Sequence, residues 1–169
     1  PSLNTIALRA ADYSIKNFIN NKNVIIFYEN TFQDSLIASL YKQKLDSSEY
    51  NIIYSQSVGI QDSRLILDSL ASSYEFILND SLYDTLSNVP GIVIKEGRGI
   101  ENMDTVYRYI EKFRIEYDSI GHIFISSKNS LFASNVVSAL DIREDTIPVI
   151  GYTEWLDFNV LSVEIGRAH

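Results

Sequence analysis

The side chains that most often carry out catalysis are scarce in this chain of 169 residues. It has two histidines, His122 and His169, and no cysteine. These are too few for a histidine metal site or a Ser-His-Asp triad, and a cysteine nucleophile or a disulfide is excluded. No serine stands in a Gly-x-Ser-x-Gly elbow, and the acidic residues mostly flank expected helices, so their spacing singles out no catalytic pair. The sequence predicts a protein that is not an enzyme and holds no metal ion.

One stretch resembles the start of a dinucleotide-binding unit. The apolar run Ile92-Val-Ile-Lys-Glu96 is followed by Gly97-Arg-Gly-Ile-Glu-Asn102 and by a pattern typical of a helix. The fingerprint requires a third glycine where Asn102 stands, because that glycine lets the helix pack closely on the strand. Asn102 is better explained as a helix N-cap, with Gly97 and Gly99 in a turn. A nucleotide-binding α/β domain stays a minor alternative, and no cofactor is expected.

Three polar loops follow expected strands, at residues 29–34, 126–130 and 151–155. In a parallel α/β sheet, ligands bind at the carboxyl ends of the strands. The second loop also begins an expected helix, whose amino terminus favours an anionic group. The same residues are equally suited to be helix caps and surface turns. The candidate ligand-binding side chains are Asn30, Thr31, Phe32, Ser126, Ser127, Lys128, Tyr152 and Glu154.

The elements that must position these loops form a recurring unit of an apolar β-branched run, a polar loop and an amphipathic stretch. The patterns predict strands at 24–28, 50–58, 122–126 and 147–150, and helices at 4–19, 32–45, 62–71, 102–117 and 130–140. Residues 74–78 fit a strand or the end of a helix, 89–94 fit a strand, and a last short strand is expected within 156–165. Alternating strands and helices predict an α/β fold, a three-layer α/β/α sandwich with a mainly parallel sheet.

Composition indicates an ordinary soluble domain. Hydrophobic residues make up 46% and charged residues 21% of the chain, and the length suits a single domain at 1–169. We expect an elaboration of that domain at about 72–99 and a short tail at 166–169. The net charge of −8 argues against binding to nucleic acid or anionic lipid. No apolar run is long enough to span a bilayer, so no membrane insertion by this segment is expected.

The order of these elements resembles the second lobe of type 1 periplasmic binding proteins, the family of branched-chain amino-acid binding proteins and receptor ligand-binding domains. A helix like Ala10-Ala-Asp-Tyr-Ser-Ile-Lys-Asn-Phe18 and a strand like Asn23-Val-Ile-Ile-Phe-Tyr-Glu29 open that lobe. A strand and turn like Ile147-Pro-Val-Ile-Gly-Tyr-Thr-Glu-Trp155 close it. The last five of these residues are most similar to envelope-associated members from Bacteroidetes-type bacteria. The sequence departs from the family at Phe32-Gln33-Asp34, where members often carry an aromatic-glycine pair.

The resemblance implies a non-enzymatic solute-binding lobe of a bacterial cell-envelope protein, in the periplasm and of the kind used in transport. Such proteins bind a small polar ligand, here an amino acid, a peptide or a wall fragment, in a cleft between two lobes. We expect the first lobe and a signal peptide to lie outside this segment. The alternative is a protein–protein scaffold or regulator of cell-wall synthesis, which uses the same fold to bind an envelope protein without a small-molecule ligand.

Overall fold

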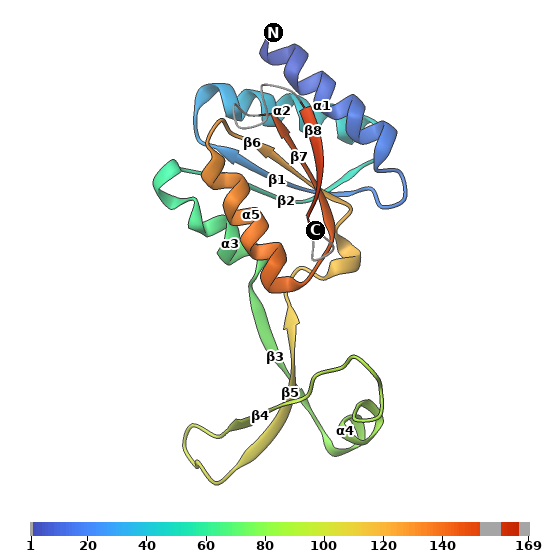
Figure 1. The fold of residues 1–169 in the computed structure, drawn as a ribbon, viewed down its shortest axis with the longest axis vertical. Coiled ribbons are helices and arrows are strands. Elements are labelled where there is room, and N and C mark those ends of the chain that lie inside the picture. The colour runs from blue at the N-terminus through green and yellow to red at the C-terminus, as the bar shows by residue number, and fades with distance from the viewer. Residues whose placement is uncertain (1, 153–159, 166–169) are drawn as a thin grey trace. The chain divides into compact units, whose positions relative to one another are not determined.

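The computed structural model describes residues 2–152 and 160–165. The chain divides into two compact units. The first consists of Pro1–Ala71 and Ile115–His169, and it holds a five-stranded sheet with helices around it (Figure 1). The second, Ser72–Arg114, holds a three-stranded sheet and one helix. The elaboration expected at about 72–99 lies inside the second unit, which continues to Arg114.

The sheet of the first unit has the strand order β2-β1-β6-β7-β8. Strands β2, β1, β6 and β7 are parallel, and β8 is antiparallel to β7. The central strands consist largely of β-branched and aromatic residues and are covered on both faces, as is typical of parallel sheets. The predicted strands and their parallel arrangement are confirmed. The bounds are β1 Asn23–Glu29, β2 Asn51–Val58, β6 His122–Ser126, β7 Ile147–Tyr152 and β8 Val160–Ile165.

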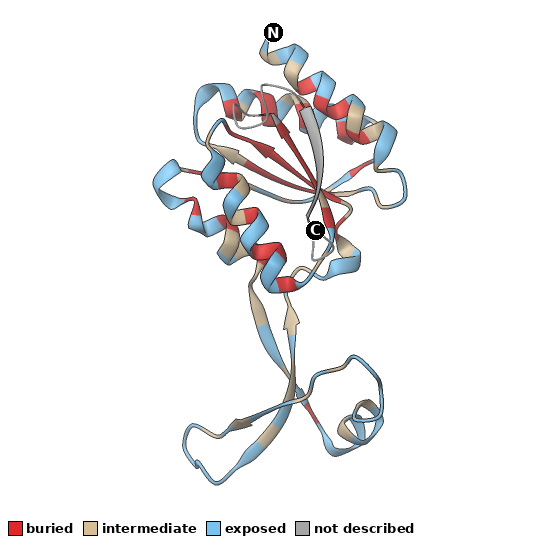
Figure 2. Ribbon diagram, viewed as in Figure 1, coloured by how far each residue is buried: buried red, intermediate tan, exposed pale blue. Residues whose placement is uncertain are grey.

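Helices cover both faces of this sheet and complete the predicted three-layer sandwich. Alternate residues of β1 point to opposite faces. Ile26 packs in one apolar cluster with α1 and α2, and Ile25 packs in another with α3 and α5. Figure 2 shows the buried strands in red between the helices. The helices are α1 Leu3–Asn17, α2 Phe32–Ser47, α3 Arg64–Leu70 and α5 Ser130–Arg143, with 3-10 turns η1 Ile60–Asp62 and η2 Tyr117–Ser119.

The second unit is an antiparallel sheet of order β3-β5-β4. Asn79 caps its short helix by accepting a hydrogen bond from the Leu82 amide at 2.8 Å. This helix was not predicted from the sequence. Residues 89–94, which fit a strand in the sequence, do not form one, and the next strand begins at Lys95. The bounds are β3 Ser73–Leu78, α4 Asp80–Leu86, β4 Lys95–Arg98 and β5 Val106–Phe113.

The helix predicted at 102–117 is wrong, because residues 106–113 form strand β5. The apolar residues Val106, Ile110 and Phe113 match a helical period, but this segment is rich in β-branched and aromatic residues that favour a strand. Asn102 does not cap a helix. Its side chain accepts a hydrogen bond from the Asp104 amide at 3.0 Å, inside the turn that joins β4 to β5. Gly97-Arg-Gly99 therefore belongs to an antiparallel hairpin, and the strand-turn-helix of a dinucleotide-binding unit is not formed.

Within the part of the chain that the structure describes, no helix has the length and apolarity needed to cross a bilayer.

Candidate functional site

The candidate site lies where the order of the strands reverses. The chain passes from β1 to β2 on one side and later enters β6 on the other side of β1. In open α/β sheets, the carboxyl ends of two such strands flank the crevice where ligands bind. Tyr28 and Ser126 are direct partners in the parallel ladder, so the loops 29–34 and 126–130 leave the sheet next to each other. Two of the three loops predicted as the site are therefore neighbours at this switch point, the edge formed by 29–34 and 126–130.

Two buried serines join these loops. The Ser126 hydroxyl donates to the carbonyl oxygen of Asp34 at 3.0 Å, and the Ser127 hydroxyl donates to Oε1 of Glu29 at 2.7 Å. The Ser127 hydroxyl also accepts the amide of Asn129 at 2.9 Å. Both serine residues have an exposed fraction of 0%. In this conformation they fix the shape of the edge and do not face solvent.

Thr31 is the N-cap of helix α2, which begins at Phe32, the start that the sequence predicts. Its hydroxyl accepts the Asp34 amide at 3.0 Å and donates to Oδ2 of the same residue at 2.8 Å. The adjacent Phe32 has an exposed fraction of 81%, and Asn30 is also exposed. The cap therefore sets the path of the loop, while Asn30 and Phe32 are presented at its surface.

Lys128 stands on the neighbouring loop, exposed to solvent. It precedes helix α5, which begins with the Asn129 side chain accepting the Leu131 amide at 2.8 Å. The positive end of the α5 dipole and the Lys128 ammonium both favour a negatively charged group at this position. The half-buried carboxylate of Glu29 offsets part of this charge from inside the edge.

Of the third predicted loop, at 151–155, the structure describes only residues 151 and 152. Tyr152 ends β7 and is the ladder partner of Ser126, which places its backbone at the same edge of the sheet. Its side chain and Glu154 lie outside what the structure describes.

Two exposed apolar residues just after the carboxyl ends of β2 and β6 were not predicted as part of the site. Ile60 follows β2 and Leu131 opens α5, and both are exposed. Leu131 fits the apolar stripe of its helix in the sequence, which hides its exposure in the first turn. Ile60 stands two residues after the end of an expected strand, and this position is the sequence signal that could have identified it as a site residue. With Phe32, they give the edge apolar as well as polar surface.

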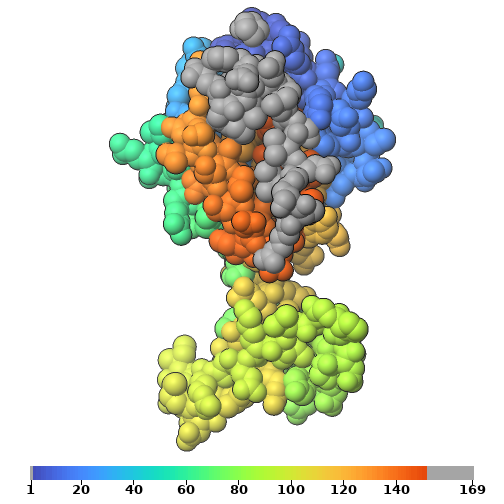
Figure 3. Space-filling view, in the orientation of Figure 1, coloured from blue at the N-terminus to red at the C-terminus, as the bar shows by residue number. Residues whose placement is uncertain are grey.

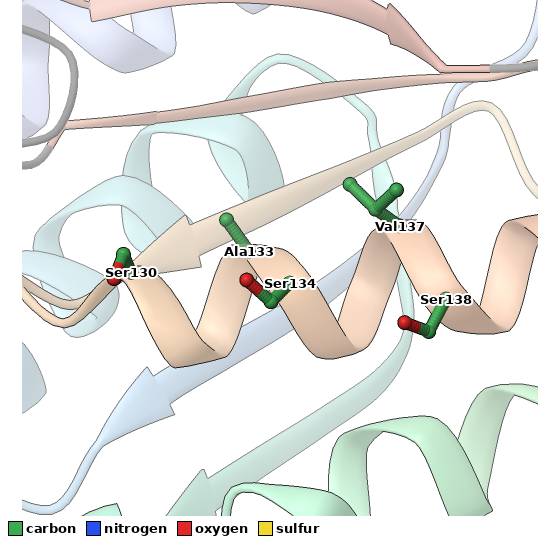
Figure 4. A pocket seen from close by; sticks show the side chains of 5 residues that line it. All are labelled: Ser130, Ala133, Ser134, Val137 and Ser138. Atoms are coloured by element: carbon green, nitrogen blue, oxygen red, sulfur yellow. The ribbon is translucent and has the colours of Figure 1, made fainter.

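A shallow hollow of about 360 Å³ runs from this edge along helix α5. Figure 4 shows the serine side chains projecting along the helix, and Figure 3 shows α5 in orange at the surface of the first unit. The hollow begins at Ser130, the last residue of the second loop. The residues that line it are Ser130, Ala133, Ser134, Val137 and Ser138.

A second polar cluster lies at the opposite, amino-terminal end of β6. His122 Nε2 is 2.6 Å from the Tyr41 hydroxyl, which is 2.8 Å from the Ser14 hydroxyl. All three residues are fully buried. Burial lowers the pKa of His122 to about 3 and raises the pKa of Tyr41, so both groups are neutral at pH 7. In this geometry His122 has a structural role, because its ring is held inside the packing of α1, α2 and β6.

Comparisons of the chain with family models, with curated proteins and with solved structures found no match. A functional assignment therefore rests on the strand topology and on the chemistry of the switch point.

Proposed function

We propose that the first unit is a non-enzymatic ligand-binding lobe of a bacterial cell-envelope protein. In the full-length protein, the switch point would form one side of a cleft that closes on a small polar ligand in the periplasm. The observation that carries this proposal is the exposure of Asn30, Phe32 and Lys128 on adjacent loops at the carboxyl ends of β1 and β6.

The state of the hydroxyl groups supports binding over catalysis. A serine nucleophile needs a neighbouring base, usually a histidine, to remove its proton. Ser126 and Ser127 lie at the carboxyl end of β6, and His122 lies at the amino end of the same strand with Nε2 against the Tyr41 hydroxyl. Both serines donate to protein oxygen atoms, which suits a rigid frame for a binding surface.

The exposed groups suit a ligand with a carboxylate and a polar or apolar side chain. Lys128 and the amino terminus of α5 favour the carboxylate, the Asn30 amide offers a donor and an acceptor, and Phe32 offers an apolar face. An amino acid, a peptide or a peptide-bearing wall fragment has these features. The ligand class expected from the sequence is thus compatible with the groups at the edge.

Thermal-shift and calorimetric titration of the full-length protein with amino acids, short peptides and soluble wall fragments tests the proposal. We expect a ligand that raises the melting temperature of the wild type and binds at least tenfold more weakly to Lys128→Ala, which removes one charge-assisted contact. Lys44→Ala, at the exposed far end of α2, is the matched control and is expected to bind like the wild type. If no member of these classes shifts the melting temperature, the proposal fails.

A protein–protein scaffold is the second candidate, and the exposed apolar residues favour it. Phe32, Ile60 and Leu131 follow three different strands and are all exposed at the edge, whereas Ser126 and Ser127 are closed to solvent. Exposed apolar groups that gather at one place often mark a contact with another protein. A photo-crosslinking amino acid at position 32 would give an adduct with an envelope protein in this case. Under ligand binding alone, it would give none.

A further inference from the structure

The second unit has very little core of its own. Among residues 72–114, all of which the structure describes, Leu78 is the only buried residue, with an exposed fraction of 8%. Figure 2 shows the rest of this unit in pale blue and tan. Four large apolar side chains are more than half exposed: Ile77, Val93, Ile100 and Met103. Units of this size usually need a disulfide, a metal or association with another chain, and this chain has no cysteine.

The two edges of the antiparallel sheet differ in how well they are protected. Strand β4 reads Lys-Glu-Gly-Arg, and its charges and glycine discourage pairing with a further strand. Strand β3 reads Ser-Tyr-Glu-Phe-Ile-Leu and has Glu75 as its one charged residue. It pairs with β5 along one side and forms the edge on its other side. An edge with high strand propensity and without proline, glycine or lysine favours the addition of another strand.

The sequence of β3 is complementary to itself in one antiparallel register. A two-fold axis perpendicular to the sheet must place one residue of β3 opposite the same residue of the second copy. For the longest overlap of the two strands, this residue must lie in the middle of β3 and is therefore Glu75 or Phe76. Pairing about Glu75 would oppose two carboxylates, which is unfavourable. Pairing about Phe76 sets Tyr74 against Leu78 and keeps the carboxylates apart, with each Glu75 opposite an Ile77.

We propose that this chain forms a homodimer in which β3 pairs antiparallel with β3 of a second copy, with Phe76 on the two-fold axis. The two small sheets then become one continuous sheet. Tyr74 and Phe76 gain apolar neighbours on one face, and on the other face each exposed Ile77 lies beside the Glu75 side chain of the second copy. We infer that the partner strand is β3 of a second copy. Of the two registers, the one about Phe76 brings more apolar side chains opposite each other and also avoids placing the two Glu75 carboxylates opposite each other.

Opposite charges at position 77 test both the dimer and its register. In the proposed pairing, Ile77→Glu creates two contacts between like charges and Ile77→Lys creates two contacts between opposite charges. Sedimentation velocity over a concentration series should show a dimer for the wild type, roughly tenfold weaker association for Ile77→Glu, and equal or tighter association for Ile77→Lys. Ile77 has an exposed fraction of 61%, so neither change should unfold the monomer.

The matched control is Ile19 in the first unit, which also has an exposed fraction of 61%. Ile19→Glu and Ile19→Lys should leave association unchanged. A wild type that stays monomeric at the highest soluble concentration overturns the proposal. Equal weakening by glutamate and lysine at position 77 also overturns it, because that result indicates loss of apolar contact without the proposed register.

Cysteine cross-linking provides a second test that does not depend on affinity. These 169 residues contain no cysteine, so a single substitution introduces one thiol into them and gives an unambiguous product. Glu75→Cys and Ile77→Cys should form a disulfide when the two proteins are mixed and oxidised, because these positions are opposite each other in the register. Ile53→Cys, on the edge strand β2 of the first unit, is the control and should not cross-link with either protein. Absence of the mixed disulfide overturns the proposal.

Discussion

The buried histidine of β6 makes the stability of the first unit depend on pH. His122 is enclosed by Phe18, whose ring stacks on it at 4.5 Å, by Tyr41 and by Tyr50. Its Nδ1 has no hydrogen-bond partner among the described residues. Desolvation lowers its pKa to about 3 from the ordinary value of 6.5. A proton can bind this ring readily in the unfolded chain but hardly at all in the folded protein.

The sign and size of the effect follow from these two pKa values. Between pH 6.5 and 3 the unfolded chain binds more protons at this residue than the folded protein does, so the free energy of unfolding falls as the pH falls. At pH 7.5 the contribution is close to zero. At pH 5 the difference of 1.5 units between the pH and the unfolded pKa corresponds to about 2 kcal/mol. Below pH 3 the loss reaches its limit.

Urea denaturation at pH 7.5 and pH 5 measures this contribution. Between pH 7.5 and pH 5, we expect the free energy of unfolding to fall by about 2 kcal/mol more in the wild type than in His122→Gln. The carboxylates that titrate in this range are present in both proteins, so their contribution cancels in the comparison. His169→Gln, which removes the other histidine, should behave like the wild type.

Measuring the His122 pKa by NMR keeps the test informative even if His122→Gln folds poorly. A pKa near 6.5 in the folded protein would refute the reasoning, and so would equal losses of stability in the wild type and in His122→Gln. Either result would mean that water or a counter-charge reaches the ring in the folded state.

Three further substitutions test contacts that hold the first unit together, each by chemical denaturation. Thr31→Ala removes the N-cap of α2 and should lower the free energy of unfolding by about 1 kcal/mol. Arg143→Met removes a buried guanidinium group that donates to the Leu70 carbonyl at 2.7 Å and to the Asp145 carboxylate at 2.7 Å, so a loss of about 3 kcal/mol is expected; an unchanged midpoint would show that these contacts contribute nothing. Gly121→Ala would make a methyl group clash with the Asn21 carbonyl oxygen, so we expect a loss of at least about 2 kcal/mol; a fully stable variant would contradict this close approach.

Local sequence was a good guide wherever one physical signal dominated. Val24-Ile-Ile-Phe27 is a continuous apolar run, and such a run is stable as a strand only when both faces are covered. Thr31 with Asp34 three residues later is a cap that needs no distant partner. The helix predicted at 102–117 fails for the opposite reason, because its apolar spacing fits two periods and the pairing of β5 with β3 and β4 decides between them.

The fold class of the first unit and the loops that end its strands could be predicted from the sequence, because strand and helix signals alternate along the chain and each depends on neighbouring residues. Which side chains those loops expose to solvent depends on tertiary contacts. Ser126 and Ser127 are buried by hydrogen bonds to residues 92 and 98 positions away in the chain, whereas Phe32 stays exposed beside them. Exposure depends on which segments meet across the sheet, and no local pattern carries that information.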